Sequence, residues 1–145
     1  MNYSELYEKI GYTFKNEELL THALTRNAYA RENGLSTSDT MDSLAVLGDA
    51  VLDLLVICQL IGEGEFDKGE ITRKKIDLVN MSVVRHVAEE LDLPHYMKWG
   101  KGELRMQVWT NGRVSAECFE ALMGAVYLDG GMEASKILYD HVWKP

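Results

Sequence analysis

The residues with the clearest potential for chemistry are carboxylates placed inside an apolar run. Residues 41–60 are largely apolar, which predicts a buried helix, yet Asp42 and Asp49 lie within it. Asp42, Ala45 and Asp49 are spaced i, i+3 and i+7, so they share one helical face. Gly48 costs about 1 kcal/mol of helix propensity relative to alanine. Its place beside Asp49 indicates close approach of a ligand or a second backbone; simple tight helix packing, with Asp49 accepting a hydrogen bond from an amide, is the alternative.

A second pair of acids lies in residues 114–128, which also predict a buried helix. Glu117 and Glu120 are neighbours on one face, where burial and mutual repulsion would disfavour their charges. If the two helices pack side by side, Asp49 joins them in an oxygen-rich site suited to magnesium or manganese. Such a site predicts phosphodiester hydrolysis. In the alternative, Glu117 faces solvent and Glu120 pairs with an arginine or lysine.

The other metal-ligating residue types do not predict a site. No zinc pattern occurs, because the four histidines are scattered along the chain. The only cysteines, Cys58 and Cys118, lie in apolar helical patterns and are expected to be buried free thiols.

The spacing of apolar residues predicts an all-α protein, and the length of 145 residues predicts one domain, residues 1–145. The predicted helices are residues 2–12, 16–30, 41–61, 70–79, 81–91, 114–128 and 133–143. Asn16 and Ser82 are candidate N-caps, and Pro94 is expected to end its helical region. Residues 98–113 contain three glycines and are predicted as a loop. The core residues expected around the glutamates are Phe119, Leu122, Met123, Val126 and Leu128.

Composition limits the partners that are expected. The net charge of −8 argues against indiscriminate coating of nucleic acid, although it allows a local basic strip. Residues 1–15 lack the apolar segment of a signal peptide, so a cytoplasmic location is expected. Residues 41–60 are judged too short and too often interrupted by acids to span a bilayer, so no membrane contact is expected.

Several segments resemble the motifs of one enzyme family, in the same order along the chain. LAVLGDAVL at residues 44–52 is similar to the signature ERLEFLGDAVL of ribonuclease III. Residues 10–30 resemble the family's N-terminal region, and residues 68–80 resemble its EGxLSxxRxxLV segment. GKGE at residues 100–103 and AECFEALMGAVYLDGG at residues 116–131 complete the resemblance, which covers nearly the whole chain.

This resemblance implies an all-helical endonuclease domain that forms a homodimer and cleaves double-stranded or structured RNA to 5′-phosphate and 3′-hydroxyl ends. It implies Mg²⁺ as cofactor, with Mn²⁺ able to substitute. Asp49, Glu117 and Glu120 correspond to metal ligands of the family, and Asp42 corresponds to the first signature glutamate, with a supporting catalytic role.

Three positions depart from the family pattern. Ala45 replaces a signature glutamate, Lys68 replaces the glutamate of the EGxLSxxR segment, and Val46 replaces an aromatic residue that contacts the partner subunit. Minimal ribonuclease III enzymes look similar at Ala45 and lack the C-terminal double-stranded-RNA-binding domain, which is also not expected here. The rival reading is a cleavage-deficient relative that binds RNA or the ribosome; the retained acids argue against it and against a purely structural dimerisation module.

Basic side chains near these motifs are candidates for RNA contacts. Double-stranded RNA is held mainly through phosphates and 2′-hydroxyls, for which lysine and arginine are suited. The candidates are Arg73, Lys74, Lys75, Lys101 and Arg105. For each of them, a solvated helix face that balances nearby acids is an equally good explanation. Trp99 and Trp109 are expected to be packing residues.

Overall fold

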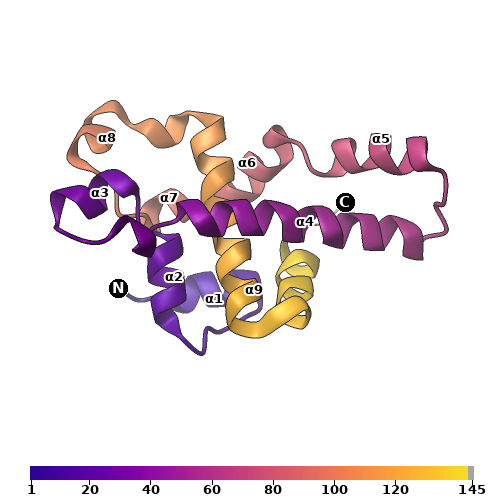
Figure 1. Ribbon diagram of the computed structural model, residues 1–145, viewed down its shortest axis with the longest axis horizontal. Coiled ribbons are helices and arrows are strands. Elements are labelled where there is room, and N and C mark those ends of the chain that lie inside the picture. Colours follow the sequence, from indigo (N-terminus) through magenta and orange to yellow (C-terminus); the bar gives the residue numbers. More distant parts are fainter. Residues whose placement is uncertain (144–145) are drawn as a thin grey trace.

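The helix α9 (Gly112–Val142) runs through the centre of the protein in the computed structural model, which describes residues 1–143 (Figure 1). In its first half, Cys118, Phe119 and residues 121–126 are buried. A helix that is apolar on nearly all sides is stable in water only when other helices surround it. Gly131, with φ of 73°, interrupts the helical path and redirects the chain, which confirms the predicted break between the helices at residues 114–128 and 133–143.

The described residues 1–143 contain no β-strand, so the all-α prediction is confirmed. The other helices are α1 (Ser4–Ile10), α2 (Glu17–Ala23), α3 (Asn27–Glu32), α4 (Asp42–Gly62), α5 (Lys68–Leu78), α6 (Met81–Glu90), α7 (Leu93–Tyr96) and α8 (Lys101–Met106). Single turns of 3-10 helix occur at Thr37–Asp39 and Val108–Thr110.

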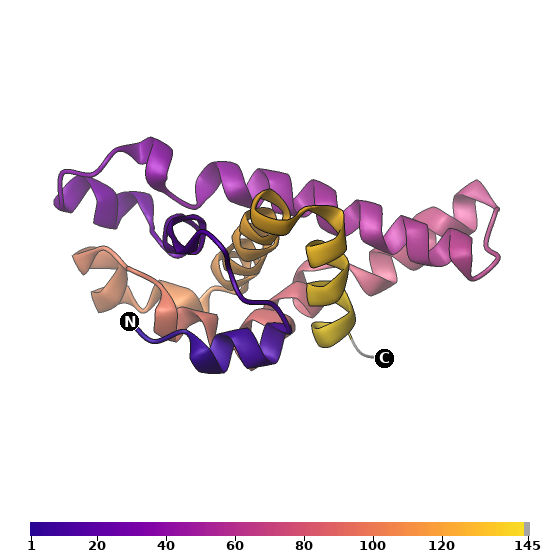
Figure 2. The same ribbon diagram turned by 90° about the horizontal axis from the view of Figure 1, so that it is seen from below.

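The long helix α4 crosses α9 and forms its most extensive contact, while α6, α2 and α1 cover other sides of α9. Figure 2 shows α4 and α1 on opposite sides of the molecule, with the first half of α9 between them. α5 runs antiparallel to α4 and extends beyond the core, and none of its residues is buried (Figure 1). The crossing of α4 and α9 therefore dominates the core.

The predicted helix at residues 16–30 is broken into α2 and α3. The backbone of Lys98 donates to the carbonyl of Leu24 over 2.7 Å and accepts from the amide of Arg26 over 3.2 Å. This short bridge to a distant segment replaces the helical hydrogen bonds that a continuous helix would need. Asn16 is the N-cap of α2, as predicted, and accepts from the amide of Glu18.

The segment predicted as a loop, residues 98–113, contains α8 instead. The amide of Gly100 donates to the carboxylate of Glu103 over 3.1 Å, which satisfies a donor at the start of this helix. Pro94 does not end its helical region; it lies in the first turn of α7, where its missing amide removes no hydrogen bond. Trp99 is buried and its ring packs against Trp109, in line with the expected packing role.

Three smaller sequence predictions are also wrong. Asn80 caps α6 by accepting from the amide of Val83, so Ser82 is not the cap. Leu128 is 53% exposed and does not belong to the core. Cys58 is exposed, in an open hollow between α4 and the second half of α9, whereas Cys118 is buried as expected.

One helical segment, Thr37–Gly62, is long and apolar enough to cross a membrane by length and composition. The sequence argument that residues 41–60 are too short was therefore wrong. Core helices of soluble proteins meet the same criteria, and in this fold α4 packs its apolar face on α9. The expected absence of membrane contact stays a prediction.

Candidate active site at the crossing of α4 and α9

The backbones of α4 and α9 approach each other closely because two glycines lie at the crossing. A Cβ atom on Gly48 would overlap the carbonyl oxygen of Glu120, and a Cβ atom on Gly124 would overlap the carbonyl of Leu44. No larger residue fits either position without a shift of backbone. The arrangement confirms that Gly48 marks close approach of a second backbone, and it places Asp49 beside Glu120.

The carboxyl groups of Asp49 and Glu120 are close enough to form a hydrogen bond. Asp49 is exposed, whereas Glu120 is partly buried. Burial is the largest cause that raises the pKa of Glu120, followed by the hydrogen bond and the charge of Asp49, and then by the charges of Glu117 and Asp53; together they raise it to about 8. The raised pKa favours the protonated form of Glu120 at neutral pH.

The pair lies in a hollow of about 260 Å³ between α4, α9 and the start of α6. Its lining residues are Asp49, Val79, Asn80, Met81, Val84, Arg113, Ala116, Glu117 and Glu120. Asp49, Glu117 and Glu120 thus line one hollow, as the sequence predicted for helices that pack side by side. Sequence reasoning gave no role here to Asn80, whose only sequence signal is its place before an apolar helix.

Glu117 is nevertheless held by a cation. Its carboxylate lies 3.4 Å from Nε of Arg113, and the side chains are 40% and 80% exposed, respectively. Within residues 1–143, no group of three or more histidine, cysteine, aspartate or glutamate side chains is close enough to hold a metal ion. The structure therefore joins two of the three predicted ligands, Asp49 and Glu120, and pairs the third with Arg113.

Asp42 is located outside this hollow, at the start of α4. The side-chain amide of Asn27 donates to its carboxylate over 2.5 Å. The amide oxygen of Asn27 is itself buried without a partner among the described residues. Exchanging the oxygen and nitrogen of this amide would place two acceptors together, so the orientation is fixed by chemistry. Asp42 is therefore oriented by α3 rather than by the other acids.

Comparison with known proteins agrees with this fold. A family model described as ribonuclease-III-like matches residues 16–143. The chain belongs to the ribonuclease-III-like family. It is 32% identical over 146 residues to ribonuclease 3 of Cupriavidus pinatubonensis and 39% identical over 137 residues to ribonuclease 3 of Bdellovibrio bacteriovorus. These matches cover 100% and 90% of this chain but 54% and 56% of the two relatives, so the chain spans about half their length.

Solved structures in the ribonuclease III family have the same fold. The nuclease domain of ribonuclease III from Campylobacter jejuni, a structure described for flexibility in a region involved in dimer formation, matches with a TM-score of 0.85 and 28% identity. The match covers 97% of this chain and 96% of that one. A second structure of that nuclease domain matches with a TM-score of 0.80 and 27% identity.

A divalent cation fits the donor set of the ribonuclease-III-like hollow. Asp49, Glu117 and Glu120 offer only carboxylate oxygens, the donors that magnesium and manganese prefer. A cation between Asp49 and Glu120 would also favour the ionised form of Glu120, which burial and the neighbouring Asp49 disfavour. Glu117 could act as the third carboxylate ligand only if its ion pair with Arg113 breaks.

The candidate RNA-binding cations divide into two groups. On α5, Arg73 contacts Glu70 over 2.6 Å, Lys74 contacts Glu65 over 2.8 Å and Lys75 contacts Asp53 over 3.4 Å. These pairs agree with the alternative that the cations balance nearby acids. On α8, Lys101 and Arg105 form no ion pair within residues 1–143 and are exposed. Figure 1 shows the two helices near opposite ends of α4.

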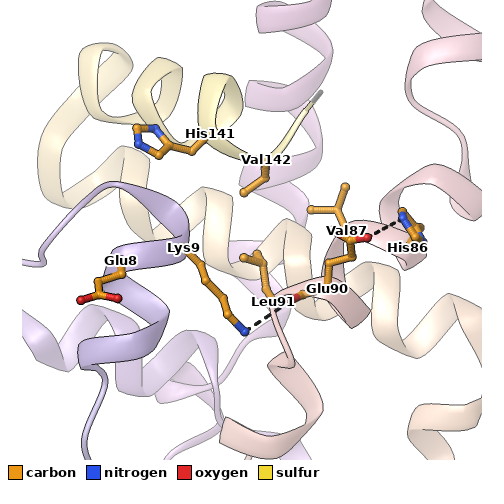
Figure 3. Close-up of a pocket in the computed structure, with 8 residues that line it drawn as sticks. All are labelled: Glu8, Lys9, His86, Val87, Glu90, Leu91, His141 and Val142. Atoms are coloured by element: carbon orange, nitrogen blue, oxygen red, sulfur yellow. Dashed lines mark hydrogen bonds and ion pairs between the residues drawn. The ribbon is translucent and has the colours of Figure 1, made fainter. Parts of the chain in front are cut away.

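A larger hollow, of about 610 Å³, lies between α1, α6 and the end of α9 (Figure 3). Its two glutamates extend from different helices, and the ring of His86 contacts Glu90 over 3.0 Å. Lys9 reaches the backbone carbonyl of Glu90, while Glu8 extends from the other side of α1 (Figure 3). Because these groups do not form a pair of neighbouring carboxylates, the hollow at the α4–α9 crossing remains the candidate active site.

Proposed function

We propose that this chain is the nuclease domain of a metal-dependent endoribonuclease that cleaves double-stranded or structured RNA. The observation that carries the proposal is the contact between Asp49 and Glu120 in a hollow of a ribonuclease-III-like fold. Two carboxylates this close repel each other when both are ionised, and a divalent cation between them relieves that repulsion. The relatives named ribonuclease 3 support the same activity.

In this proposal Asp49 and Glu120 hold Mg²⁺, or Mn²⁺ in its place, and Glu117 completes the set. The bound ion supplies activation of water and neutralisation of the charge that develops on the phosphate. Glu120 gives up its proton when the cation binds, because both carboxylates must then be ionised. Asp42, oriented by Asn27, supports the site from the start of α4. The expected products carry 5′-phosphate and 3′-hydroxyl ends.

RNA contacts are assigned first to Lys101 and Arg105, because their charges are free of ion pairs among the described residues. Arg73, Lys74 and Lys75 would have to exchange an acidic partner for a phosphate, which reduces the gain in binding free energy. The expected binding is directed at the shape and backbone of RNA and weakens with salt. A cytoplasmic location stays a prediction.

A homodimer is also part of the proposal. On α4, Val46 is 75% exposed and Leu54 is 47% exposed. Leu54 lines an apolar hollow together with Met132 of α9. Exposed apolar side chains along one helix mark an interaction surface, and dimer formation described for the Campylobacter jejuni domain supports a second copy as the partner. Replacing Val46 by Phe should tighten this dimer; an unchanged dissociation constant would exclude a contact at Val46.

The rival function is an RNA- or ribosome-binding relative that does not cleave. Ala45 and Lys68 favour it, since each replaces an expected acid. The close contact between Asp49 and Glu120 opposes it, because a partly buried pair of acids lowers stability and has no evident structural use.

The deciding experiment measures cleavage of a labelled RNA duplex with Mg²⁺ or Mn²⁺. The wild type is expected to cut, and Asp49→Asn and Glu120→Gln are expected to lose activity by at least about a hundredfold, the scale of a lost electrostatic contribution in catalysis. Glu133→Gln, an exposed acid on the second half of α9, is the matched control and should cut normally. Duplex binding without cutting by the wild type at high metal concentration would support the rival.

A further inference from the structure

The one cation that lines the acidic hollow is Arg113, which is largely exposed and forms an ion pair with Glu117. We propose that Arg113 competes with the divalent cation for Glu117, so that the metal site of this domain is completed only when Glu117 leaves Arg113. This inference rests on the proposed metal-dependent function. It assigns to Arg113 a role in setting metal affinity, as a positioning residue for Glu117.

The exchange is sterically simple. Glu117 and Glu120 lie three residues apart on α9 and both line the hollow, so a rotation of the Glu117 side chain suffices to redirect its carboxylate toward Asp49. The side chain of Glu117 is 40% exposed. Among the described residues its carboxylate accepts a hydrogen bond only from Arg113. Glu117 is therefore held in its present position by Arg113 alone.

The location of Arg113 is not explained by helix stability. Arg113 lies in the first turn of α9, where the positive end of the helix dipole disfavours a cation. The pair also has the arginine N-terminal to the glutamate, which is the less favourable order for an i, i+4 pair. A side chain so placed contributes little to the fold, whereas it adds the one positive charge that lines this acidic hollow.

The competition is expected to be mild, because an exposed ion pair of this kind is weak. Metal binding should displace Arg113 readily, and removal of the arginine should tighten metal binding by about two- to fivefold, which is the scale of one exposed charge pair. A much larger effect is not expected, since Asp49 and Glu120 are already in contact in the presence of Arg113.

The test measures Mn²⁺ affinity by electron paramagnetic resonance of the free ion, without RNA and without any readout of cleavage. Arg113→Gln is expected to bind Mn²⁺ more tightly than the wild type, and Glu117→Gln more weakly. The control, Lys136→Gln, removes one positive charge from another exposed i, i+4 pair of α9, Lys136–Asp140, and should leave the affinity unchanged.

The double variant Arg113→Gln/Glu117→Gln separates competition from a general effect of charge. If Arg113 acts through Glu117, its removal gives no gain once Glu117 is neutral. An equal gain in both backgrounds would overturn the inference, as would an unchanged affinity of Arg113→Gln; either result leaves the proposed nuclease intact. If the wild type binds no Mn²⁺, or if Asp49→Asn does not weaken the binding, both proposals are overturned.

Discussion

Gly48 of α4 lies against the backbone carbonyl of Glu120 in α9, with no room for a Cβ atom between them. Because Asp49 follows Gly48 directly, this contact sets the separation between the two carboxyl groups of the candidate active site. Gly124 makes the reciprocal contact with the carbonyl of Leu44. The geometry of the acidic pair is thus determined by backbone packing at a helix crossing.

Replacing Gly48 by Ala is expected to lower the free energy of unfolding by about 1–3 kcal/mol, the usual cost of overpacking. Alanine favours a helix by up to about 1 kcal/mol over glycine, but the added Cβ would overlap backbone atoms that cannot move independently. Urea unfolding followed by circular dichroism measures the effect. Gly62→Ala, in the same helix with open space around it, is the control and should be neutral or stabilising. An equal change in unfolding free energy in Gly48→Ala and Gly62→Ala would contradict tight packing at the crossing.

The stability of the metal-free protein is expected to depend on pH through Glu120. Its folded-state pKa, about 8, lies above the ordinary value of 4.5, mainly because of burial and then because of Asp49. Ionisation of Glu120 therefore costs more free energy in the folded than in the unfolded state. The free energy of unfolding should fall as pH rises from the ordinary pKa toward the raised folded-state pKa. Glu120→Gln should remove this fall and be more stable than the wild type at pH 8. If the free energies of unfolding of the two proteins change with pH in parallel, Glu120 is not the cause of the fall.

The sequence alone predicts the two buried helices that carry the candidate site. The apolar runs around Asp49 and Glu120 exceed what a surface helix needs, so both helices had to be buried, and Gly48 indicated close packing at a definite position. Contact between the two acids was predictable only on the condition that the helices pack side by side. The alternative paired a cation with Glu120, whereas the structure pairs Arg113 with Glu117; this i, i+4 contact is local and could have been recognised from the spacing.

Features that depend on distant partners were missed. The break between α2 and α3 requires Lys98, which lies more than 70 residues away and gives no local signal at Leu24. The three glycines and weak periodicity of residues 98–113 predict a loop, whereas a side-chain cap and a tertiary ion pair hold α8 in place. In each case a tertiary contact outweighs local propensity.

Asp129→Asn is expected to loosen the attachment of the N-terminal segment to α9. The carboxylate accepts hydrogen bonds from the hydroxyl of Tyr12 and from the amides of Lys15 and Asn16, over 2.5, 2.8 and 2.9 Å. Partial burial acts to raise the pKa of Asp129, but these hydrogen bonds outweigh it and lower the pKa below 3.8. An asparagine keeps one acceptor, so a loss of about 1–2 kcal/mol in unfolding free energy is expected.

The same carboxylate gives a second, independent readout. Because its folded-state pKa is lowered, Asp129 stabilises the fold at pH values above the ordinary 3.8, and this contribution disappears as pH falls through the lowered folded-state value. Wild type and Asp129→Asn should therefore converge in stability under strongly acidic conditions. Asp140→Asn, which alters an exposed ion pair with Lys136, is the control; a loss as large as that of Asp129→Asn would argue against the anchor.

The ion pair between Arg26 and Glu103 should be the most costly single salt bridge to break. Both side chains are 18% exposed, and one carboxylate oxygen accepts from Nε and Nη2 of Arg26 over 3.0 and 2.7 Å. Burial disfavours both charges, yet their hydrogen bonds and attraction leave the pKa of Glu103 lowered and that of Arg26 raised. Arg26→Met leaves Glu103 without its partner, and a loss of about 3 kcal/mol is expected.

The double variant Arg26→Met/Glu103→Leu tests whether the loss comes from an unpaired charge. Removing both partners should be less destabilising than the sum of the single changes, because no buried charge is left behind. Arg85→Gln breaks the exposed pair Arg85–Glu89 and should cost at most about 1 kcal/mol. Hydrogen exchange should also show faster opening of α8 in Arg26→Met, since Glu103 both pairs with Arg26 and accepts from the amide of Gly100. Unchanged protection of α8 would mean that its order does not depend on this pair.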